Sequence, residues 1–545
     1  MGNINLICFN QKKYKPKWNS GDIINSSFSI KSINSNIINN KKKSDWILFW
    51  DYRIGLPDEK YINNLTNQIG DVFHLGLLFG LGDLPMSLNY LRPNWLLILN
   101  SDKNIKSISW RLTPQACLIK TDLFKNMESF IQHYEDINYS FLDFGFNLIK
   151  QGFVPRYSPG MIYEKKEFKK IIYSEFDELI FIKNNFSKKW YYWVLFRKIL
   201  TNQLKVLDFI KTLKLKKIFT NEIKLNNNIV DSYSLDNKKT KFINNISIII
   251  PTLYRYNYLL RLLKQINNQN ILPNQVIIID QTPIDYRENI NKSEFDKLDI
   301  VMIYLKKMGQ STARNEGIKI CKTDYVLFCD DDIEIKNNFI ENHIENSIPN
   351  NDTISCGTAI ESDINKLYYK NSYRRIAEGF AGGNSLIPIK FFLKTGLFDL
   401  AFDKGMRADR DLGIRLFLNG YTIILDPSIV VLHHRANKGG LRHHNQRKIT
   451  FYGSRQSIIK LHIPSVSDFY ISKRYFSDIQ NKEMYWLAIL GTFAYHGNKI
   501  SFILQTLYSF FCIPKTIWTI NQRIAKAKEL LKTYPKIPTF YKIDE

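Results

Sequence analysis

A regular alternation of apolar strands and amphipathic helices, beginning near residue 244, constrains the fold of this chain more than any other feature. Between the first two strands, apolar residues recur at i, i+3, i+4 and i+7 from Leu259, the period of a helix packed on one face. Another helix is expected from Ser311, whose hydroxyl suits an N-cap. Strands separated by helices indicate a mainly parallel sheet covered on both faces. The expected strands are ISIII (246–250), QVIIID (275–280), IVMIYL (300–305) and YVLFC (325–329).

Three of these strands run into residues that suit a ligand site, namely Pro251, Asp280 and Asp330. In parallel α/β sheets ligands bind beyond the carboxyl ends of the strands. Asp330 is followed by Asp331 and Asp332, and three adjacent carboxylates repel one another. Two aspartates separated by one residue can direct their oxygens to one hard cation such as Mg²⁺ or Mn²⁺. Taken alone, the triplet also fits a solvated turn after a strand.

Length and composition limit the number of domains, the kinds of partner and the cellular compartment of the protein. A chain of 545 residues is expected to form two to four domains, and its net charge of +25 favours anionic partners: nucleic acid, an acidic membrane surface or phosphorylated substrates. Six scattered cysteines without a CxxC pair favour a reducing compartment, with neither zinc nor a disulfide framework. No signal peptide and no run of about 18 apolar residues is found. We therefore expect a cytoplasmic protein.

A set of motifs follows in order between residues 244 and 445. The motifs are SIIIPTLYR, the strand-end Asp of VIIIDQTP, GQSTARNEGI, YVLFCDDDIEI, GGNSLIP with GLFDLAF, and ADRDLGIRLFLNGYTIILDPSIVVLHH. Together they resemble family 2 glycosyltransferases with the GT-A fold. The resemblance implies an α/β nucleotide-diphospho-sugar transferase fold with a mainly parallel central sheet, a donor that is usually UDP-linked, Mn²⁺ or Mg²⁺, and inversion at the anomeric carbon.

The resemblance also implies roles for individual residues. The metal ligands would be Asp330 and Asp332. The nucleotide and its phosphates would be bound by Pro251, Thr252, Arg255, Asp280, Arg314, Asp331, His433, His434 and Arg435. The acceptor side would be formed by Gly382, Gly383, Asn384 and Asp411.

The resemblance makes Asp409 the catalytic base. A carboxylate within reach of an acceptor hydroxyl can take its proton as the oxygen attacks the anomeric carbon. The family commonly has Glu-Asp at this point, whereas this chain has Ala408-Asp409, which puts acceptor positioning in question. The alternative is that Asp409 only caps the helix that follows.

The segment HHRANKGGLRHHNQRK (433–448) contains four His, three Arg, two Lys and no acidic residue. Such a basic loop would repel a cation, so we expect it to bind the donor diphosphate after closure, with Gly439 and Gly440 as a hinge. An exposed basic loop without that role is the alternative.

The chain also contains an apparent internal repeat. DWILFWDYRIGLPDEKYINNL (45–65) aligns without gaps on DYVLFCDDDIEIKNNFIENHI (324–344), and SFLDFGFNLIKQGF (140–153) aligns on ADRDLGIRLFLNGY (408–421). In this register Arg53 takes the place of Asp332, and Phe141 takes the place of Asp409. We therefore predict a degenerate, truncated GT-A-like copy that performs no transfer. Glu135-Asp136 resembles the family Glu-Asp in a different register.

The expected organisation follows from these segments. The stripe from Ile517 to Tyr534 is expected to pack within the molecule, with a dimer seam or a basic membrane-surface helix as alternatives. The expected domains are a polar flexible leader (1–43), the degenerate GT-A-like unit (44–180), a helical segment and linker (181–243), the catalytic GT-A domain (244–445) and a helical carboxyl-terminal region (446–545).

The leading hypothesis, implied by the resemblance, is an inverting, metal-dependent glycosyltransferase of hexosyltransferase type. It would move a sugar from a nucleotide-diphospho-sugar to a hydroxyl of a glycan or lipid-linked acceptor in cell-surface polysaccharide synthesis. A nucleotidyltransferase of related fold is the alternative, followed by a non-catalytic nucleic-acid-binding protein. We expect no nucleic acid partner, because the densest basic cluster is not interleaved with exposed aromatics. Homodimerisation and peripheral attachment at the inner membrane face remain open.

Overall fold

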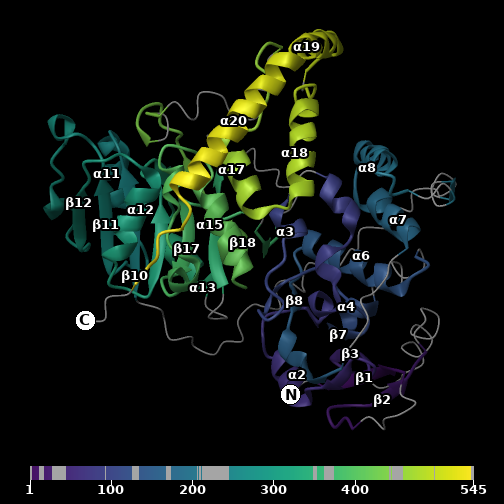
Figure 1. Cartoon of the computed structure of the whole chain (residues 1–545). Coiled ribbons are helices and arrows are strands. Elements are labelled where there is room, and N and C mark those ends of the chain that lie inside the picture. Colours follow the sequence, from purple (N-terminus) through teal and green to yellow (C-terminus); the bar gives the residue numbers. More distant parts are fainter. Residues whose placement is uncertain are drawn as a thin grey trace. The chain divides into compact units, whose positions relative to one another are not determined.

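The protein folds into two compact units, each with its own β-sheet, in a computed structural model of the whole chain (Figure 1). The first unit comprises residues 1–238, 373–376 and 417–422, and the second comprises 239–372, 377–416 and 423–545. The structure describes residues 3–10, 17–27, 44–91, 94–125, 134–166, 174–204, 207, 210–211, 245–347, 353–360, 373–377, 379–440, 443–444, 458–495 and 497–541. Most of the expected linker, including LNNNIVDSYSLDNKKTK, lies outside these residues, as do 441–442 and 445–457.

The sheet of the second unit contains all four strands that the sequence predicts. These strands are β10 (Ile246–Thr252), β11 (Gln275–Asp280), β12 (Ile300–Tyr304) and β13 (Tyr325–Cys329). They are mutually parallel in the order β12-β11-β10-β13. Beyond β13 the sheet continues with β17 (Asn384–Pro388), β15 (Thr353–Ile360), β18 (Thr422–His433) and β14 (Ile333–Glu334), and β17 runs antiparallel to β13. The predicted α/β fold with a mainly parallel central sheet is therefore confirmed.

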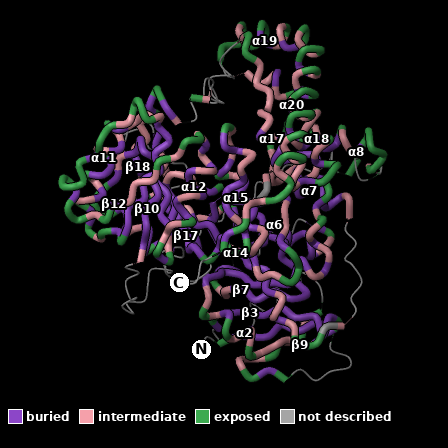
Figure 2. The backbone as a smooth tube through the Cα atoms, turned by 60° about the vertical axis from the view of Figure 1, so that its left-hand side comes forward, coloured by how far each residue is buried: buried purple, intermediate pink, exposed green. Residues whose placement is uncertain are grey.

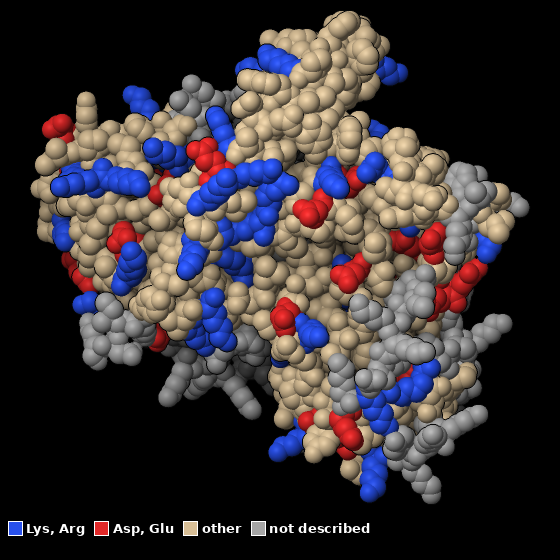
Figure 3. All heavy atoms as spheres, viewed as in Figure 1, with Lys and Arg blue, Asp and Glu red and all other residues tan. Residues whose placement is uncertain are grey.

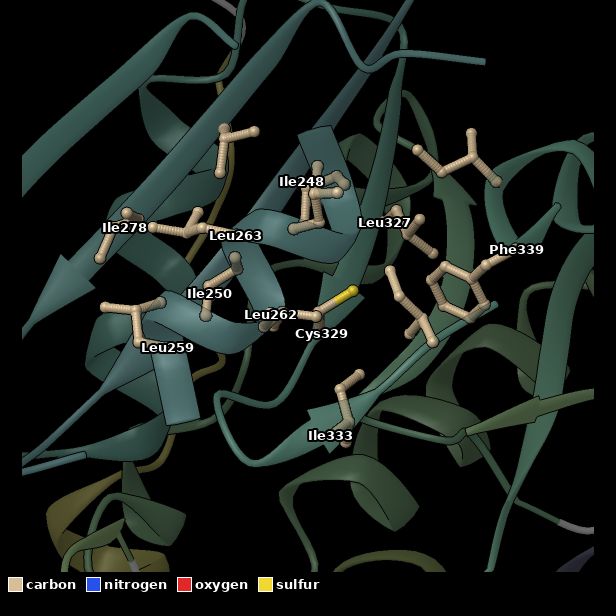
Figure 4. Close-up of a cluster of buried hydrophobic side chains, with 14 of the residues drawn as sticks. Ile248, Ile250, Leu259, Leu262, Leu263, Ile278, Leu327, Cys329, Ile333 and Phe339 are labelled. Atoms are coloured by element: carbon tan, nitrogen blue, oxygen red, sulfur yellow. The ribbon is translucent and has the colours of Figure 1, made fainter. Parts of the chain in front are cut away.

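The core of this unit lies between the sheet and the helix α11 (Tyr256–Asn267). Leu259, Leu262 and Leu263 are fully buried and pack against isoleucines of β10 and β11, as Figure 4 shows. Because the parallel strands are covered on both faces, they carry continuous β-branched runs and not an alternating pattern. Helix α12 (Gln310–Lys319) packs against β10 and β11. Its N-cap is Gly309, two residues before the predicted one, so the expected capping role of Ser311 is wrong.

In the part of the chain that the structure describes, four helices follow the sheet and confirm the expected helical carboxyl-terminal region. They are α17 (Val466–Tyr475), α18 (Asp478–Gly491), α19 (Lys499–Phe511) and α20 (Ile513–Thr533). Helix α20 packs extensively on α17, and its stripe residues Ile520 and Ala527 are fully buried. The stripe therefore packs within the molecule. Among the described residues, no single helix is long and apolar enough to cross a membrane; α19 and α20, bent by 67°, meet that length and composition test only as a pair.

The sheet of the first unit has the order β2-β1-β3-β7-β5-β8-β6. Its first strand, β1 (Ile4–Phe9), is buried on both faces: Leu6 joins one hydrophobic cluster and Ile7 the other. The remaining strands are β2 (Ile23–Asn25), β3 (Trp46–Asp51), β5 (Val72–His74), β6 (Ser107–Ile108), β7 (Ala116–Lys120) and β8 (Pro155–Tyr157). The expectation of a polar flexible leader over residues 1–43 is thus wrong for β1 and β2. These strands are short and lie among polar residues, so the polar composition of the whole segment did not indicate them.

The two sheets share a strand order. The sequence β2-β1-β3-β7-β5-β8 in the first unit corresponds to β11-β10-β13-β17-β15-β18 in the second. The directions agree as well, because β1 is parallel to β2 and β3, as β10 is to β11 and β13. Strand β7 is antiparallel to β3, as β17 is to β13. The strands β1 and β2 occupy in the first sheet the places that β10 and β11 occupy in the second.

Candidate active site

The carboxyl ends of β10 and β13 open into a cleft of the second unit with about 750 Å³ of empty space, part of it open to solvent. A concave site with a few convergent polar groups is the usual place for a small-molecule or cofactor ligand. Most of the charged residues in its wall come from the turns that follow these two strands and from α12. The lining residues are Pro251, Thr252, Leu253, Arg255, Gln281, Gly309, Gln310, Arg314, Asp330, Asp331, Asp332, Asp403, His433, Gly440 and His444.

Asp331 ties the turn after β13 to the turn after β10. The Thr252 hydroxyl donates to one carboxylate oxygen of Asp331 at 2.8 Å, and Nη1 of Arg255 donates to the other at 2.8 Å. The same Nη1 lies 3.2 Å from Asp332 Oδ2. Arg255 Nε also donates to the Lys438 carbonyl at 2.8 Å. Arg255 therefore joins three loops around the cleft and acts as a positioning residue.

In this network, burial and the neighbouring charges shift the pKa values of Asp331 and Arg255 in opposite directions. Burial raises the pKa of Asp331 to about 6, although the Arg255 guanidinium acts to lower it. Burial also disfavours the charge on Arg255, but Asp331 and Asp332 outweigh this effect and raise the pKa of the guanidinium. The Arg255 side chain is only 11% exposed, so its interaction with Asp331 is weakly screened by solvent.

Asp330, Asp332 and His433 form a cluster that fits a divalent cation. One potential ligand atom from each residue lies within 4.8 Å of those of the others. His433 is the last residue of β18, and its Nε2 is 3.6 Å from Asp332 Oδ1 and 3.8 Å from Asp330 Oδ2. Carboxylate oxygens with one imidazole suit Mn²⁺, and carboxylates alone also suit Mg²⁺. The two aspartates predicted as metal ligands thus lie together, and His433 joins them.

Arg314 and two glycines close the cleft next to Asp330. Arg314 Nη2 donates to Asp330 Oδ1 at 3.1 Å and to the Gly382 carbonyl at 3.3 Å. A Cβ on Gly383 would lie 2.4 Å from the Asp330 carboxyl carbon, so only glycine permits this approach. A Cβ on Gly382 would lie 3.4 Å from Cβ of Asp409. The expected base therefore lies beside the glycine turn that borders the metal cluster.

Asp409 itself is exposed and lies in the first turn of α15 (Ala408–Leu418). Its Oδ1 accepts a hydrogen bond from the backbone amide of Arg410 at 2.9 Å. Because the helix already begins at Ala408, Asp409 does not occupy the N-cap position that the alternative interpretation gave it. Its carboxylate is accessible to an acceptor.

A further carboxylate of the cleft, Asp403, was not predicted. It accepts hydrogen bonds from the backbone amide and the hydroxyl of Thr312, both at 2.7 Å. A Cβ on Gly309 would lie 2.4 Å from its carboxyl carbon, and the Gly309 amide donates to Gln281 at 2.6 Å. Asp403 directly follows the motif GLFDLAF, and Gly309 opens GQSTARNEGI. Neither motif alone indicates that the two meet in space.

Three residues expected to bind the nucleotide lie outside the lining. Asp280 is fully buried and accepts hydrogen bonds from the Tyr256 hydroxyl at 2.5 Å and the Thr282 amide at 2.8 Å. His434 pairs with Glu334 at 2.6 Å. Arg435 is exposed, and its backbone adopts a positive φ of 51°. The strand-end position of Asp280 is as expected, but its carboxylate holds the adjoining turn.

Two residues expected on the acceptor side have structural partners instead. Asn384 is buried in β17, and its side-chain carbonyl lies 2.8 Å from Nε2 of His343. Asp411 is fully buried, with one oxygen paired to Arg415 and the other accepting from the Tyr475 hydroxyl at 2.6 Å. All residues of β17 are buried, and Asp411 lies in the buried part of α15. The acceptor roles expected for them are not supported.

The basic loop after β18 contributes through its glycines. Gly439 and Gly440 have φ values of +74° and +52°, in the left-handed region that favours glycine. A Cβ on Gly439 would lie 2.0 Å from the Leu253 carbonyl oxygen. The glycines thus let the loop lie against the turn after β10. Their expected role as a hinge stays a prediction.

The model of the family described as Glycosyl transferase family 2 matches residues 247–406. Residues 247–406 are therefore similar to the domain that this family shares. The match covers β10, α12, β13 and the glycine turn, which together carry most of the cleft. The chain is also 36% identical over 103 residues to the uncharacterized glycosyltransferase YwdF of Bacillus subtilis (strain 168), covering 18% of this chain and 35% of that protein. It therefore spans about a third of the length of this curated relative.

Two solved structures are similar to part of the chain. The S. aureus TarS fragment 1–349 in complex with UDP-GlcNAc is 15% identical, with a TM-score of 0.31, over 53% of this chain and 82% of that one. The mannosyltransferase PcManGT from Pyrobaculum calidifontis in complex with GDP-Man and Mn²⁺ is 14% identical, with a TM-score of 0.30, over 53% and 79%.

Proposed function

We propose that this family 2 domain is an inverting glycosyltransferase that uses a nucleotide-diphospho-sugar, UDP-linked, and a divalent metal ion. The observation that carries the proposal is the meeting of Asp330, Asp332 and His433 beside Arg314 in the cleft. Two carboxylates held near two guanidinium groups form a site for a cation and a diphosphate together. The acceptor would be a hydroxyl of a glycan or of a lipid-linked glycan in cell-surface polysaccharide synthesis.

The reaction requires a proton acceptor next to the attacking hydroxyl. Asp409 would take that proton while the acceptor oxygen bonds to the anomeric carbon and the bond from this carbon to the donor diphosphate breaks. Attack from the face opposite the diphosphate inverts the anomeric configuration. The exposure of Asp409 and its position beside Gly382 support this role.

The other residues of the cleft would bind and orient the donor. Asp330, Asp332 and His433 would hold the cation, which when bound neutralises charge on the departing nucleoside diphosphate. Arg314 lies within reach of the same region through Asp330, and Arg255 keeps Asp331 and Asp332 in place. Gly440 and His444 would cover the phosphates from the loop after β18.

We further propose that the first unit is a degenerate GT-A-like copy without transferase activity. The shared strand order and directions of the two sheets support an internal duplication. At the place of the metal pair, Arg53 donates to Asp51 through Nε at 2.9 Å, so a guanidinium neutralises the carboxylate. Phe141, at the place of the base, is fully buried. This unit would serve as a scaffold, recognise the acceptor or mediate association.

The experiment is a panel of UDP- and GDP-sugars assayed with Mn²⁺ for release of UDP, GDP or pyrophosphate. We expect UDP release with at least one donor, reduced by about a hundredfold or more in Asp332→Asn, since even residues outside the ligand set cost 10–100-fold when lost. Asp296→Asn, at an exposed aspartate of the same unit, is the matched control and should retain activity.

Two outcomes would contradict the proposal. Equal turnover by the wild type and Asp332→Asn would remove the role of the metal cluster. Release of pyrophosphate in place of UDP would indicate nucleotidyl transfer, the alternative that also fits a carboxylate-held metal in an α/β fold.

A further inference from the structure

Helix α19 (Lys499–Phe511) exposes most of its large apolar side chains and buries the polar residues Gln505 and Ser509. Ile500 is 73% exposed and Phe511 is 79% exposed, whereas Gln505 and Ser509 are buried. The other exposed large apolar residues of this helix are Phe502, Ile503, Leu504, Leu507 and Phe510. A surface helix in water does the opposite, because its apolar stripe faces the core. The outer face of α19 is therefore built for a non-aqueous environment.

The buried polar residues hold α19 to the end of α18. The side-chain amide of Gln505 donates to the Thr492 carbonyl and, at 2.8 Å, to the Ser509 hydroxyl. The Ser509 hydroxyl donates to the same carbonyl at 2.9 Å. Helices that face lipid associate in this way, through small and polar residues between them while apolar residues point outward. A protein partner does not require a polar interior of this kind.

The apolar surface continues onto the neighbouring helix ends. Trp486 and Leu490 of α18 and Trp518 of α20 are also exposed, and tryptophan favours the boundary between lipid and water. Within the second unit, α19 lies at the ends of α18 and α20 that are distant from the sheet (Figure 1). Figure 2 shows this end of the unit mostly green, the colour of exposed residues.

The charge around α19 suits an anionic surface. Residues 484–528 contain no Asp or Glu, and their basic residues are Lys499, Lys515, Arg523, Lys526 and Lys528. Figure 3 shows the tip of this projection mainly tan, with blue beside it. Lysine and arginine next to an apolar segment are attracted to anionic lipid headgroups.

The length of α19 decides how it would meet a bilayer. Its 13 residues extend about 20 Å, which is shorter than the hydrocarbon core of about 30 Å. The chain then bends by 67° into α20, whose second half carries several charges. We propose that α19 lies in the interfacial plane of an anionic lipid bilayer and attaches the second unit to it. This inference stands independently of the proposed transferase activity.

The test is flotation of the full chain with vesicles of phosphatidylcholine, with and without phosphatidylglycerol. We expect the wild type to float with anionic vesicles and to bind neutral ones more weakly. A variant that carries both Leu504→Ser and Leu507→Ser should have a partition coefficient at least tenfold lower. It loses the burial of two leucine side chains in lipid, and a tenfold change corresponds to a loss of about 1.4 kcal/mol. Lys499→Glu with Lys515→Glu should weaken binding to anionic vesicles selectively.

The matched control replaces two leucines of the same unit that lie outside this surface. Leu272 is 39% exposed and Leu393 is 53% exposed, similar to Leu507 at 52%, so Leu272→Ser with Leu393→Ser should float like the wild type. An unchanged thermal unfolding temperature shows that each variant is folded. The proposal is overturned if the wild type does not float, or if the Leu504/Leu507 variant floats as well as the wild type.

Two further outcomes would assign the surface to something else. A lipid-free dimer that dissociates in the Leu504/Leu507 variant would mean that a second copy of the chain covers α19. Resistance of the vesicle-bound protein to alkaline carbonate extraction would mean that α19 and α20 cross the bilayer and do not lie in its plane.

Discussion

Substituting Asp411 distinguishes a structural role from the acceptor role that the sequence suggests. Asp411 is fully buried, and its Oδ2 accepts hydrogen bonds from Nε and Nη2 of Arg415 at 2.9 and 2.7 Å. Arg415 is also buried, and its Nη1 donates to the Thr395 carbonyl at 2.6 Å. In Asp411→Asn the guanidinium loses its counter-charge inside the unit. We therefore expect lower stability rather than weaker acceptor binding.

The magnitude follows from the burial of the pair. Removing one partner of a buried ion pair costs about 3–5 kcal/mol, because the other charge is left uncompensated. For domains of this size class, 1 kcal/mol corresponds to about 2–4 °C, so the unfolding temperature should fall by roughly 6–20 °C. Replacing the pair with apolar residues of similar volume is often nearly neutral. The double variant Asp411→Leu/Arg415→Met should therefore lose less stability than Asp411→Asn.

Thermal unfolding and nucleotide-release kinetics together provide the measurement. Below its melting temperature, Asp411→Asn should keep the acceptor KM of the wild type, since the Asp411 carboxylate of the wild type does not line the cleft. The reasoning is refuted if the unfolding temperature is unchanged while the acceptor KM rises. A double variant that is less stable than the single one would also contradict the ion-pair account.

Three other perturbations follow from the structure. Asp409→Ala should lower turnover by about 10²–10⁴-fold without destabilising the unit. Asp136→Ala should keep the activity and lower the free energy of unfolding by about 1 kcal/mol, because Asp136 caps α6 (Ile137–Lys150). Equal losses of activity in the two variants would contradict the assignment of Asp409 as the base. Burial lowers the pKa of His343 to about 4 in the folded protein, whereas its ordinary pKa is about 6.5. Between these two pH values, His343 is protonated in the unfolded chain but not in the folded one. His343 should therefore reduce stability by up to about 3 kcal/mol as pH falls through this range, and unfolding of His343→Gln should show a correspondingly weaker pH dependence; parallel curves would contradict it. Gly309→Ala should displace Asp403, destabilise the unit by about 1–3 kcal/mol and raise the donor KM. Unaltered kinetics would show that the Asp403 side chain moves aside without affecting the donor site.

Local patterns predicted the parts of the site that depend on position along a strand. Pro251, Asp330 and Asp332 follow directly from strand ends, since apolar runs show where the strands stop. The partners of these residues were beyond local patterns. Asp403 reaches the cleft from a segment about 90 residues after Gly309, and their meeting depends on how α12 packs, which no motif records.

Side-chain direction explains the predictions that failed. Asp411 and Asn384 lie in the right motifs, but a helix and a strand each direct neighbouring residues to different faces, and packing decides which face is the interior. Strand β1 (Ile4–Phe9) was missed for the related reason that five apolar residues and one Asn, set among polar residues, become a buried strand only when other elements cover them.

The sequence by itself determined the α/β class, the order of the four parallel strands along the chain and the carboxylates at their ends, because backbone periodicity and strand termini are local properties. Only the tertiary structure decided which charges meet. It brought His433 to Asp330 and Asp332, occupied Asp411 with Arg415, and turned the apolar face of α19 outward. These outcomes depend on contacts between distant segments, whose energies are set by burial and by the partners that packing supplies.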